Sequence, residues 1–155
     1  MNDFAANPKS YDPRMHSAEH ILNQTMVRMF ACGRSVNAHI EKKKSKCDYW
    51  LDRNLLPEEV AEVEARVNAV IAGDLPVTAR FIGRDEAARS FNLSRLPDEA
   101  AGTIRIVEIG DYDACPCSGE HVASTRAIGR FHIASTEHLN NLLRIRFKLD
   151  DASAA

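Results

Sequence analysis

The order of helix-like and strand-like segments constrains the fold of this chain more than any other feature. Apolar residues recur at helical spacings in residues 14–31 and 55–73, whereas residues 76–82, 103–110 and 142–149 have the character of strands. The two kinds of segment are interspersed without a regular β-α-β rhythm, which disfavours a parallel sheet. We therefore expect an α+β fold in which helices pack on a mostly antiparallel sheet.

Capping residues mark the ends of the two long predicted helices. Asp12 and Pro13 suit the start of the first helix, and Gly33 suits its end. Pro57 opens the second helix with two glutamates in its first turn, and Gly73 closes it. We predict a hairpin from residues 35–41 and 46–52, a short helix at 84–91 and a loop with some helical turn at 92–102. A cysteine-rich loop follows at 111–121, and residues 128–136 are predicted as a strand that pairs with the last one.

The composition is that of an ordinary globular domain. The 155 residues are 45% hydrophobic and 27% charged, and we find no repeat or low-complexity tract. No apolar run approaches the roughly 20 residues that cross a bilayer, and residues 1–13 lack the basic start and apolar stretch of a signal peptide. We expect a single domain over residues 1–155, located in the cytoplasm and not bound to a membrane.

The charge distribution argues against a broad nucleic-acid-binding surface. The net charge is −2, and we expect no DNA partner. Positive charge is nonetheless concentrated in residues 41–46 and 142–148. Both segments fit either a contact with RNA or a solvated hairpin tip and the exposed face of an edge strand.

His16 and His20 form an H-x-x-x-H motif in the first predicted helix. Residues i and i+4 lie on one face of a helix about one turn apart, so both imidazoles can reach one ion. The same spacing arises by chance, and surface or core histidines also explain it.

Cys117 and His121 form a second motif with the same spacing and with Gly119 between them. Thiolate and imidazole groups are zinc ligands, and zinc prefers four ligands in a tetrahedron. One helix would supply two ligands and one loop the other two, so each motif provides the ligands that the other lacks. Cys115 is expected to be a buried or loop cysteine, although it is close enough to replace Cys117.

Three other roles for the cysteines fit less well. A disulfide between Cys115 and Cys117 would span a single residue and be strained, and a chain with 4 cysteines lacks a secreted disulfide framework. A redox pair normally has C-x-x-C spacing. A nucleophilic pair of Cys117 and His121 would lack an evident oxyanion-stabilising group and would leave H-x-x-x-H unexplained.

The two motifs together resemble the editing domain of alanyl-tRNA synthetases. In that domain the second segment typically reads C-G-G-T-H-V, followed by a threonine and then I-G. The matching positions run in order through Cys117, Gly119, His121, Val122, Thr125, Ile128 and Gly129. The resemblance extends from about His16 to Leu149 and includes no aminoacylation domain. The chain is therefore similar to short free-standing alanyl-tRNA editing proteins, which share their fold with the threonyl-tRNA synthetase editing domain.

The resemblance implies a zinc-dependent hydrolase that removes a wrong amino acid, chiefly serine, from the 3′ CCA end of mischarged tRNA for alanine. The ligands of the Zn²⁺ ion would be His16, His20, Cys117 and His121. Zinc can polarise or position a water, or hold the amino group of the substrate. Serine exceeds alanine by one hydroxyl, which binding alone rejects poorly, so a second hydrolytic site is physically reasonable.

Three further positions are candidate site residues. Glu120 stands where the synthetases have threonine; it is a candidate catalytic residue, with a solvated loop carboxylate as the alternative. Asn37 falls near the position of a threonine that binds the serine hydroxyl in short relatives, so its amide is a candidate substrate contact. Arg126, beside the predicted zinc loop, is a candidate contact to the tRNA.

Two rival functions stay open. One is a zinc-stabilised RNA-binding module without catalysis, in which the four protein ligands close the site. The other is a deacylase of a different mischarged aminoacyl-tRNA, such as that for threonine. The predicted ligand set does not separate these functions, and the sequence does not give the oligomeric state.

Overall fold

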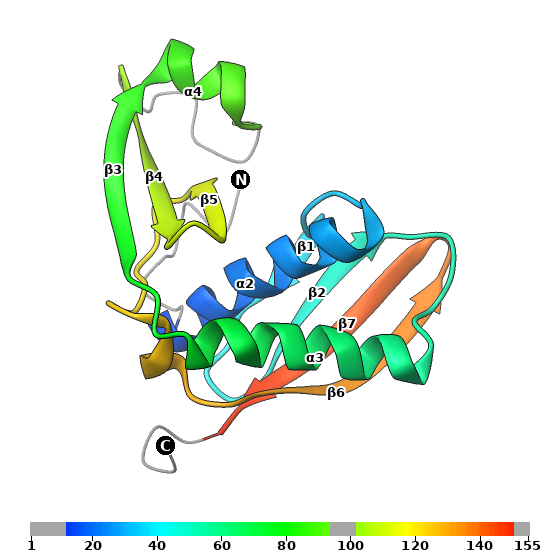
Figure 1. The fold of residues 1–155 in the computed structure, drawn as a ribbon. Helices are drawn as coiled ribbons and strands as arrows, with labels where there is room; N and C mark the ends of the chain where they lie inside the picture. The colour runs from blue at the N-terminus through cyan, green and yellow to red at the C-terminus, as the bar shows by residue number, and fades with distance from the viewer. Residues whose placement is uncertain (1–11, 94–101, 151–155) are drawn as a thin grey trace.

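The computed structural model describes residues 12–93 and 102–150, and it has an α+β fold (Figure 1). Its elements in chain order are α2 (Pro13–Phe30), β1 (Asn37–His39), β2 (Ser45–Trp50), α3 (Pro57–Ala72), β3 (Val77–Gly83), α4 (Arg84–Ser90), β4 (Thr103–Ile109), β5 (Asp113–Pro116), the 3₁₀ helix η2 (Thr125–Ile128), β6 (Phe131–Leu139) and β7 (Leu142–Leu149). Across the described residues, no helix combines the length and the apolar character needed to span a bilayer.

The strands form two sheets, where the sequence predicts one. The larger sheet has the order β1-β2-β7-β6 and the smaller sheet has the order β3-β4-β5. Every pairing in them is antiparallel, so the expected α+β class with antiparallel strands is confirmed. Within the described residues, β4 pairs with β3 and β5 and with no strand of the larger sheet. The two sheets therefore have no hydrogen-bonded edge in common.

The main core lies between the larger sheet and the helices α2 and α3, which run along it in Figure 1. Alternate residues of β2 and β7 enter this core because successive side chains of a strand point to opposite faces. Its fully buried members from the sheet and the helices include Cys47, Tyr49, Leu143, Ile145, Phe147, Ile21, Leu22, Met26, Val63 and Val67. A second, smaller cluster between α4 and the smaller sheet contains Ala87, Ile104 and Ile106.

Helix α2 begins as the sequence predicts and ends two residues earlier than its expected glycine stop. The side chain of Asp12 accepts hydrogen bonds from the N–H groups of Arg14 and Met15, which would otherwise lack partners in the first turn. At the other end, Ala31 takes the left-handed conformation with φ 55°. Gly33 does not provide the stop, because the chain has already left the helix at Ala31.

The segment after β4 differs from the sequence prediction. Residues 113–116 form strand β5 on the edge of the smaller sheet, where the sequence predicts a loop. Four residues that end in a proline are too few to show an alternating pattern. The strand expected at 128–136 begins at Phe131, because residues 125–128 form η2. The loop expected at 92–102 lies mostly outside the described residues.

Candidate metal centre

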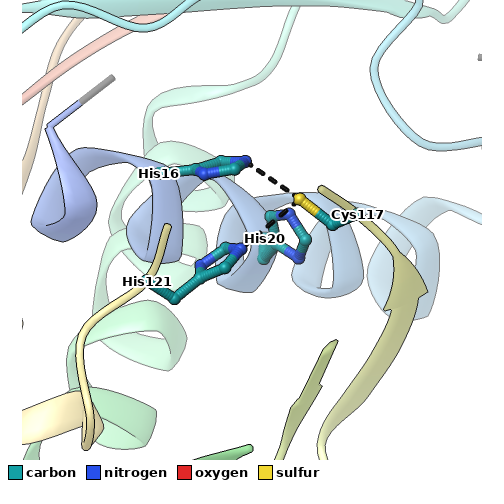
Figure 2. A group of neighbouring side chains, drawn as sticks. All are labelled: His16, His20, Cys117 and His121. Atoms are coloured by element: carbon teal, nitrogen blue, oxygen red, sulfur yellow. Dashed lines mark hydrogen bonds between the residues drawn. The ribbon is translucent and has the colours of Figure 1, made fainter. Parts of the chain in front are cut away.

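The side chains of the two motifs converge on one point (Figure 2). The ligand atoms of His16, His20, Cys117 and His121 all lie within 4.8 Å of one another. Sγ of Cys117 lies 3.4 Å from Nε2 of His16 and 3.5 Å from Nε2 of His121. In a tetrahedral site with Zn–N of about 2.0–2.1 Å and Zn–S of about 2.3 Å, neighbouring ligand atoms lie about 3.3–3.6 Å apart. The four side chains can therefore hold a metal ion, and their spacing is consistent with zinc; Cys115 is not in this group.

Helix α2 supplies both histidines from a buried position. Ile21 and Leu22 of the helix belong to the main core, while His16 and His20 are each only 3% exposed. Four residues make about one helical turn, so the two imidazoles lie next to each other, with ring centroids 5.0 Å apart. Burial of both sides of the helix fixes the direction in which the two rings point.

The loop after β5 is held in place by Arg105 of β4. The N–H of Cys117 donates to the carbonyl of Arg105 at 3.2 Å. In return, Nη1 of Arg105 donates to the carbonyls of Cys117 and Gly119 at 2.8 and 2.9 Å. A β-carbon built on Gly119 would lie 2.4 Å from Cε1 of His16. Only a glycine at this position lets the loop approach the imidazole closely enough to bring both motifs together.

Hydrogen bonds behind the rings turn two imidazoles toward the cluster. Nδ1 of His16 lies 3.1 Å from the carbonyl oxygen of Glu120, and Nδ1 of His121 lies 2.9 Å from Oγ of Ser17. The same Oγ accepts the N–H of Val122 at 3.2 Å. Because a carbonyl oxygen only accepts, a neutral His16 carries its proton on Nδ1 and presents the lone pair of Nε2 to the cluster. Such partners orient histidine ligands in metal sites.

A buried carboxylate lies behind His20. Nδ1 of His20 is 3.6 Å from Oδ2 of Asp113, and this nitrogen has no hydrogen-bond partner among the described residues. Arg34 forms an ion pair with the same carboxylate at 2.7 Å. Burial acts to raise the pKa of Asp113, but His20 and Arg34 outweigh it, so the pKa lies well below its usual range. Asp113 is therefore ionised and favours a proton on the facing nitrogen of His20.

The electrostatics of the cluster favour a thiolate. Burial acts to raise the pKa of the Cys117 thiol, but hydrogen bonds with His121, His16 and His20 outweigh it, and the pKa falls to about 2. Burial also lowers the pKa of His121 to about 4, against the hydrogen bond with Cys117. At neutral pH, Cys117 is a thiolate and His121 is neutral, which are the forms that bind metal ions.

The other predicted site residues are not among the four side chains of this cluster. The side chain of Glu120 is exposed, and the backbone carbonyl of this residue is the group that contacts His16. Asn37 is exposed on the edge strand β1, and its Nδ2 donates to Oδ2 of Asp48 at 3.5 Å. Arg126 is exposed in η2.

The sequence does not reveal three residues that support the cluster. Ser17, Arg105 and Asp113 each act through a partner on another element. Ser17 lies inside the H-x-x-x-H motif, but no local spacing indicates that it meets His121. Their roles depend on how α2 and the smaller sheet come together, which a single sequence does not encode as a pattern.

Thr125, a position of the second motif, has a structural role. Its Oγ1 donates to the carbonyl of Val70 at 2.9 Å and accepts the N–H of Leu75 at 2.9 Å. The residue is fully buried. Thr125 thus attaches η2, and with it the loop that carries His121, to the end of α3.

Proteins of known function resemble this chain in sequence. A family described as "Threonyl and Alanyl tRNA synthetase second additional domain" matches residues 104–146. The alanine–tRNA ligase of Methanopyrus kandleri is 32% identical over 146 residues, which cover 90% of this chain and 16% of the ligase. The ligase of Metallosphaera sedula is 34% identical over 146 residues, which cover 89% of this chain and 16% of the ligase. The ligase of Bordetella petrii is 29% identical over 129 residues, which cover 79% of this chain and 14% of the ligase. The chain is an editing-domain-like protein.

The family match covers one half of the metal centre of this editing-domain-like protein. Cys117 and His121 lie within the matched residues 104–146, whereas His16 and His20 precede them. The fold brings α2 against the loop after β5 and so completes the cluster. The chain spans 14–16% of the length of the curated ligases named above.

Proposed function

We propose that this chain is a zinc-dependent hydrolase that deacylates mischarged tRNA for alanine, chiefly tRNA charged with serine. The observation that carries the proposal is the convergence of His16, His20, Cys117 and His121 in a relative of alanine–tRNA ligases. The thiolate character of Cys117 supports it further, because thiolate and neutral imidazole are ligands that zinc prefers.

The chain's own residues hold this centre and shape it. A bound zinc ion would supply Lewis-acid polarisation and would help to orient the substrate. Ser17 and the carbonyl of Glu120 orient two of the imidazoles, and Arg105 fixes the loop that carries the thiolate. The ligands are therefore held in advance, which reduces the reorganisation needed when substrate binds.

Three exposed side chains are the proposed substrate contacts. The carboxylate of Glu120, in the loop between two ligands, would accept a proton from the attacking water. The amide of Asn37 both donates and accepts, so it would recognise the serine hydroxyl. Arg126 would contact phosphates of the 3′ CCA end of the tRNA.

A zinc-stabilised RNA-binding module is the second candidate. Four protein ligands complete a tetrahedron, which is typical of structural zinc sites, whereas catalytic sites usually keep one position open. A deacylase for a different amino acid or tRNA would use the same centre, so the choice of substrates in the assay separates it from the main proposal.

Deacylation of charged tRNA tests the proposal directly. The purified chain is incubated with tRNA for alanine charged with serine, glycine or alanine, with and without a chelator. We expect rapid release of serine, little release of alanine, and loss of activity with the chelator. Cys117→Ala should lose both metal and activity, while Glu120→Gln, which keeps the backbone carbonyl, should lower kcat less. Cys32→Ala is the matched control, because Cys32 is a half-buried cysteine outside the cluster.

Two outcomes would contradict the main proposal. Equal release of alanine and serine would rule out an editing role, since the enzyme would destroy the correct product. Stoichiometric zinc without hydrolysis of any charged tRNA would favour the RNA-binding module.

A further inference from the structure

The smaller sheet has one covered face and one face turned toward the metal centre. Ile104 and Ile106 of β4 pack against Ala87 of α4 on the first face. Asp113 of β5 points to the other side, where it meets Arg34 and Gln24. Because side chains alternate along a strand, the odd-numbered residues of β4 and β5 share this second face.

A row of three residues crosses this second face: Phe81, Arg105 and Cys117. Phe81 of β3 is the antiparallel partner of Arg105 in β4. The N–H of Cys117 donates to the carbonyl of Arg105, which continues the register of β4 with β5 by one residue. Directly opposed residues in antiparallel strands point to the same face. Neighbouring strands are about 4.8 Å apart, so Phe81 lies about 10 Å from Cys117 across the sheet.

The ring of Phe81 is exposed to solvent. The side chain of Phe81 is 67% exposed, although it occupies the row that contains a predicted metal ligand. Single exposed hydrophobic residues are common and carry no meaning alone. Two other large hydrophobic residues, Trp50 and Leu139, are also exposed. Each is a cross-strand partner of Leu142 at one end of the larger sheet. Among these residues, Phe81 is the one that shares a sheet row with the metal centre.

Arg105 gives the row a fixed positive charge between the ring and the thiolate. Its side chain is half-buried, and Nη1 is held by two carbonyls of the loop. An aromatic ring beside a positioned cation suits a nucleotide, because the ring stacks on the base and the cation attracts the phosphate. The ester that the proposed function cleaves and the base of the same nucleotide are joined to one ribose, so a base-binding ring two strands away from the thiolate is suitably placed.

We propose that Phe81 is the stacking platform for the terminal nucleobase of the tRNA 3′ end, with Arg105 attracting the adjoining phosphate. This assignment rests on the proposed function for the identity of the ligand. Stacking on an aromatic ring tolerates any base, so Phe81 contributes affinity and places the ester, while the amino acid is selected elsewhere.

Binding of short RNA tests the assignment without requiring hydrolysis. The probe is a labelled CCA trinucleotide, compared with the same trinucleotide in which the terminal base is missing. We expect Phe81→Ala to weaken binding of the CCA probe by about 5- to 150-fold, the range for one stacked base. Phe81→Tyr should restore affinity, because it keeps the ring. Leu139→Ala, at an equally exposed hydrophobic residue of the other sheet, should have no effect.

The probe without the terminal base provides the decisive comparison. The wild type should bind it about as weakly as Phe81→Ala binds the complete probe, and Phe81→Ala should cause no further loss. The assignment is wrong if the wild type does not bind the CCA probe, if Phe81→Ala binds it with wild-type affinity, or if Phe81→Ala weakens both probes equally.

Failure of this inference and failure of the proposed function are distinguishable. Base-dependent binding through Phe81 in a chain that deacylates no charged tRNA would contradict the proposed function and leave the stacking platform standing. Deacylation with a KM unchanged by Phe81→Ala, together with unchanged binding of the CCA probe, would contradict the stacking platform and leave the proposed function standing.

Discussion

Gly119 lies against the imidazole of His16 so closely that a β-carbon would come within 2.4 Å of Cε1 and 2.8 Å of Nδ1. The contact joins the loop after β5 to helix α2 at the metal centre. The ring of His16 cannot yield easily, because Glu120 holds its Nδ1 and the helix around it is buried.

Gly119→Ala should therefore displace His16 and weaken metal binding. We expect the zinc affinity to fall by at least about tenfold, the size of effect seen when the support of a ligand is lost. Competition with a chromophoric chelator measures this affinity. Gly33→Ala is the matched control, because a β-carbon at Gly33 meets nothing within 4 Å. Equal zinc affinities for the two variants would show that the close approach of Gly119 does not set the ligand geometry.

Ser17→Ala should weaken metal binding through His121. The substitution removes the hydroxyl that orients Nδ1 of His121 and accepts the N–H of Val122. Loss of such a partner typically lowers metal affinity by about 10- to 100-fold. Ser45→Ala is the control: Ser45 is also buried and bonded to the backbone of Glu41, but it lies in β2. It should lower stability without changing zinc affinity, whereas a similar loss of affinity in both variants would contradict a specific role for Ser17.

Thr125→Val should destabilise the fold and spare the metal centre. The hydroxyl of Thr125 bonds the carbonyl of Val70 and the N–H of Leu75. Valine removes both bonds; the carbonyl of Val70 still accepts the N–H of Gly73, whereas the N–H of Leu75 loses its acceptor. We expect a loss of about 1–3 kcal/mol in the free energy of unfolding. Denaturant titration of the metal-loaded protein measures it, and Thr125→Ser should recover part of the loss. An unchanged stability of Thr125→Val would contradict the structural role.

Lowering the pH should remove the contribution of the ion pair between Asp48 and Arg144 to the free energy of unfolding. Hydrogen bonds from Nε and Nη2 of Arg144, at 2.8 and 3.0 Å, lower the pKa of Asp48 against the opposing effect of burial. A lowered pKa in the folded state stabilises the fold above the unfolded-state pKa of about 3.9, and this contribution disappears as the pH falls through the folded-state value. The stability difference between wild type and Asp48→Asn should be constant at neutral pH and shrink below about pH 4.

Denaturant titrations at a series of pH values check this expectation. Arg144→Met should reduce the pH dependence of the difference, because the main group that lowers the pKa of Asp48 is gone while Asn37 and Lys46 remain. A difference that stays constant through the acid range would show that the pair does not stabilise the fold.

The helices were predictable because their signals are local. Proline, the capping Asp12 and helical periodicity lie within or beside α2, so the predicted 14–31 and the observed Pro13–Phe30 nearly coincide. The division into two sheets was not predictable, because it depends on which strands meet across long stretches of chain. Strand β5 was not predicted for a different reason: it has four residues, and it forms a strand through its pairing with β4.

The convergence of the four side chains in the candidate metal centre was predictable, whereas the residues that support them were not. The four ligands occur in two motifs with regular spacing, and the resemblance to synthetase editing domains links the motifs. Ser17 and Arg105 have no such spacing, since each meets its partner through the packing of α2 and the smaller sheet. Phe81 likewise stands out through its strand register and its exposure, which the sequence does not show.

The long separation in sequence between His20 and Cys117 has a consequence for how the protein unfolds. An ion bound by both would act as a cross-link that closes a loop of about 100 residues, for which chain-entropy estimates give about 4–5 kcal/mol. Much of that effect would act on the unfolded chain, by limiting how far its ends can move apart. A metal-loaded molecule would then open less often and expose its backbone to proteases less often, so the supply of metal would influence how long the protein survives as well as its chemistry.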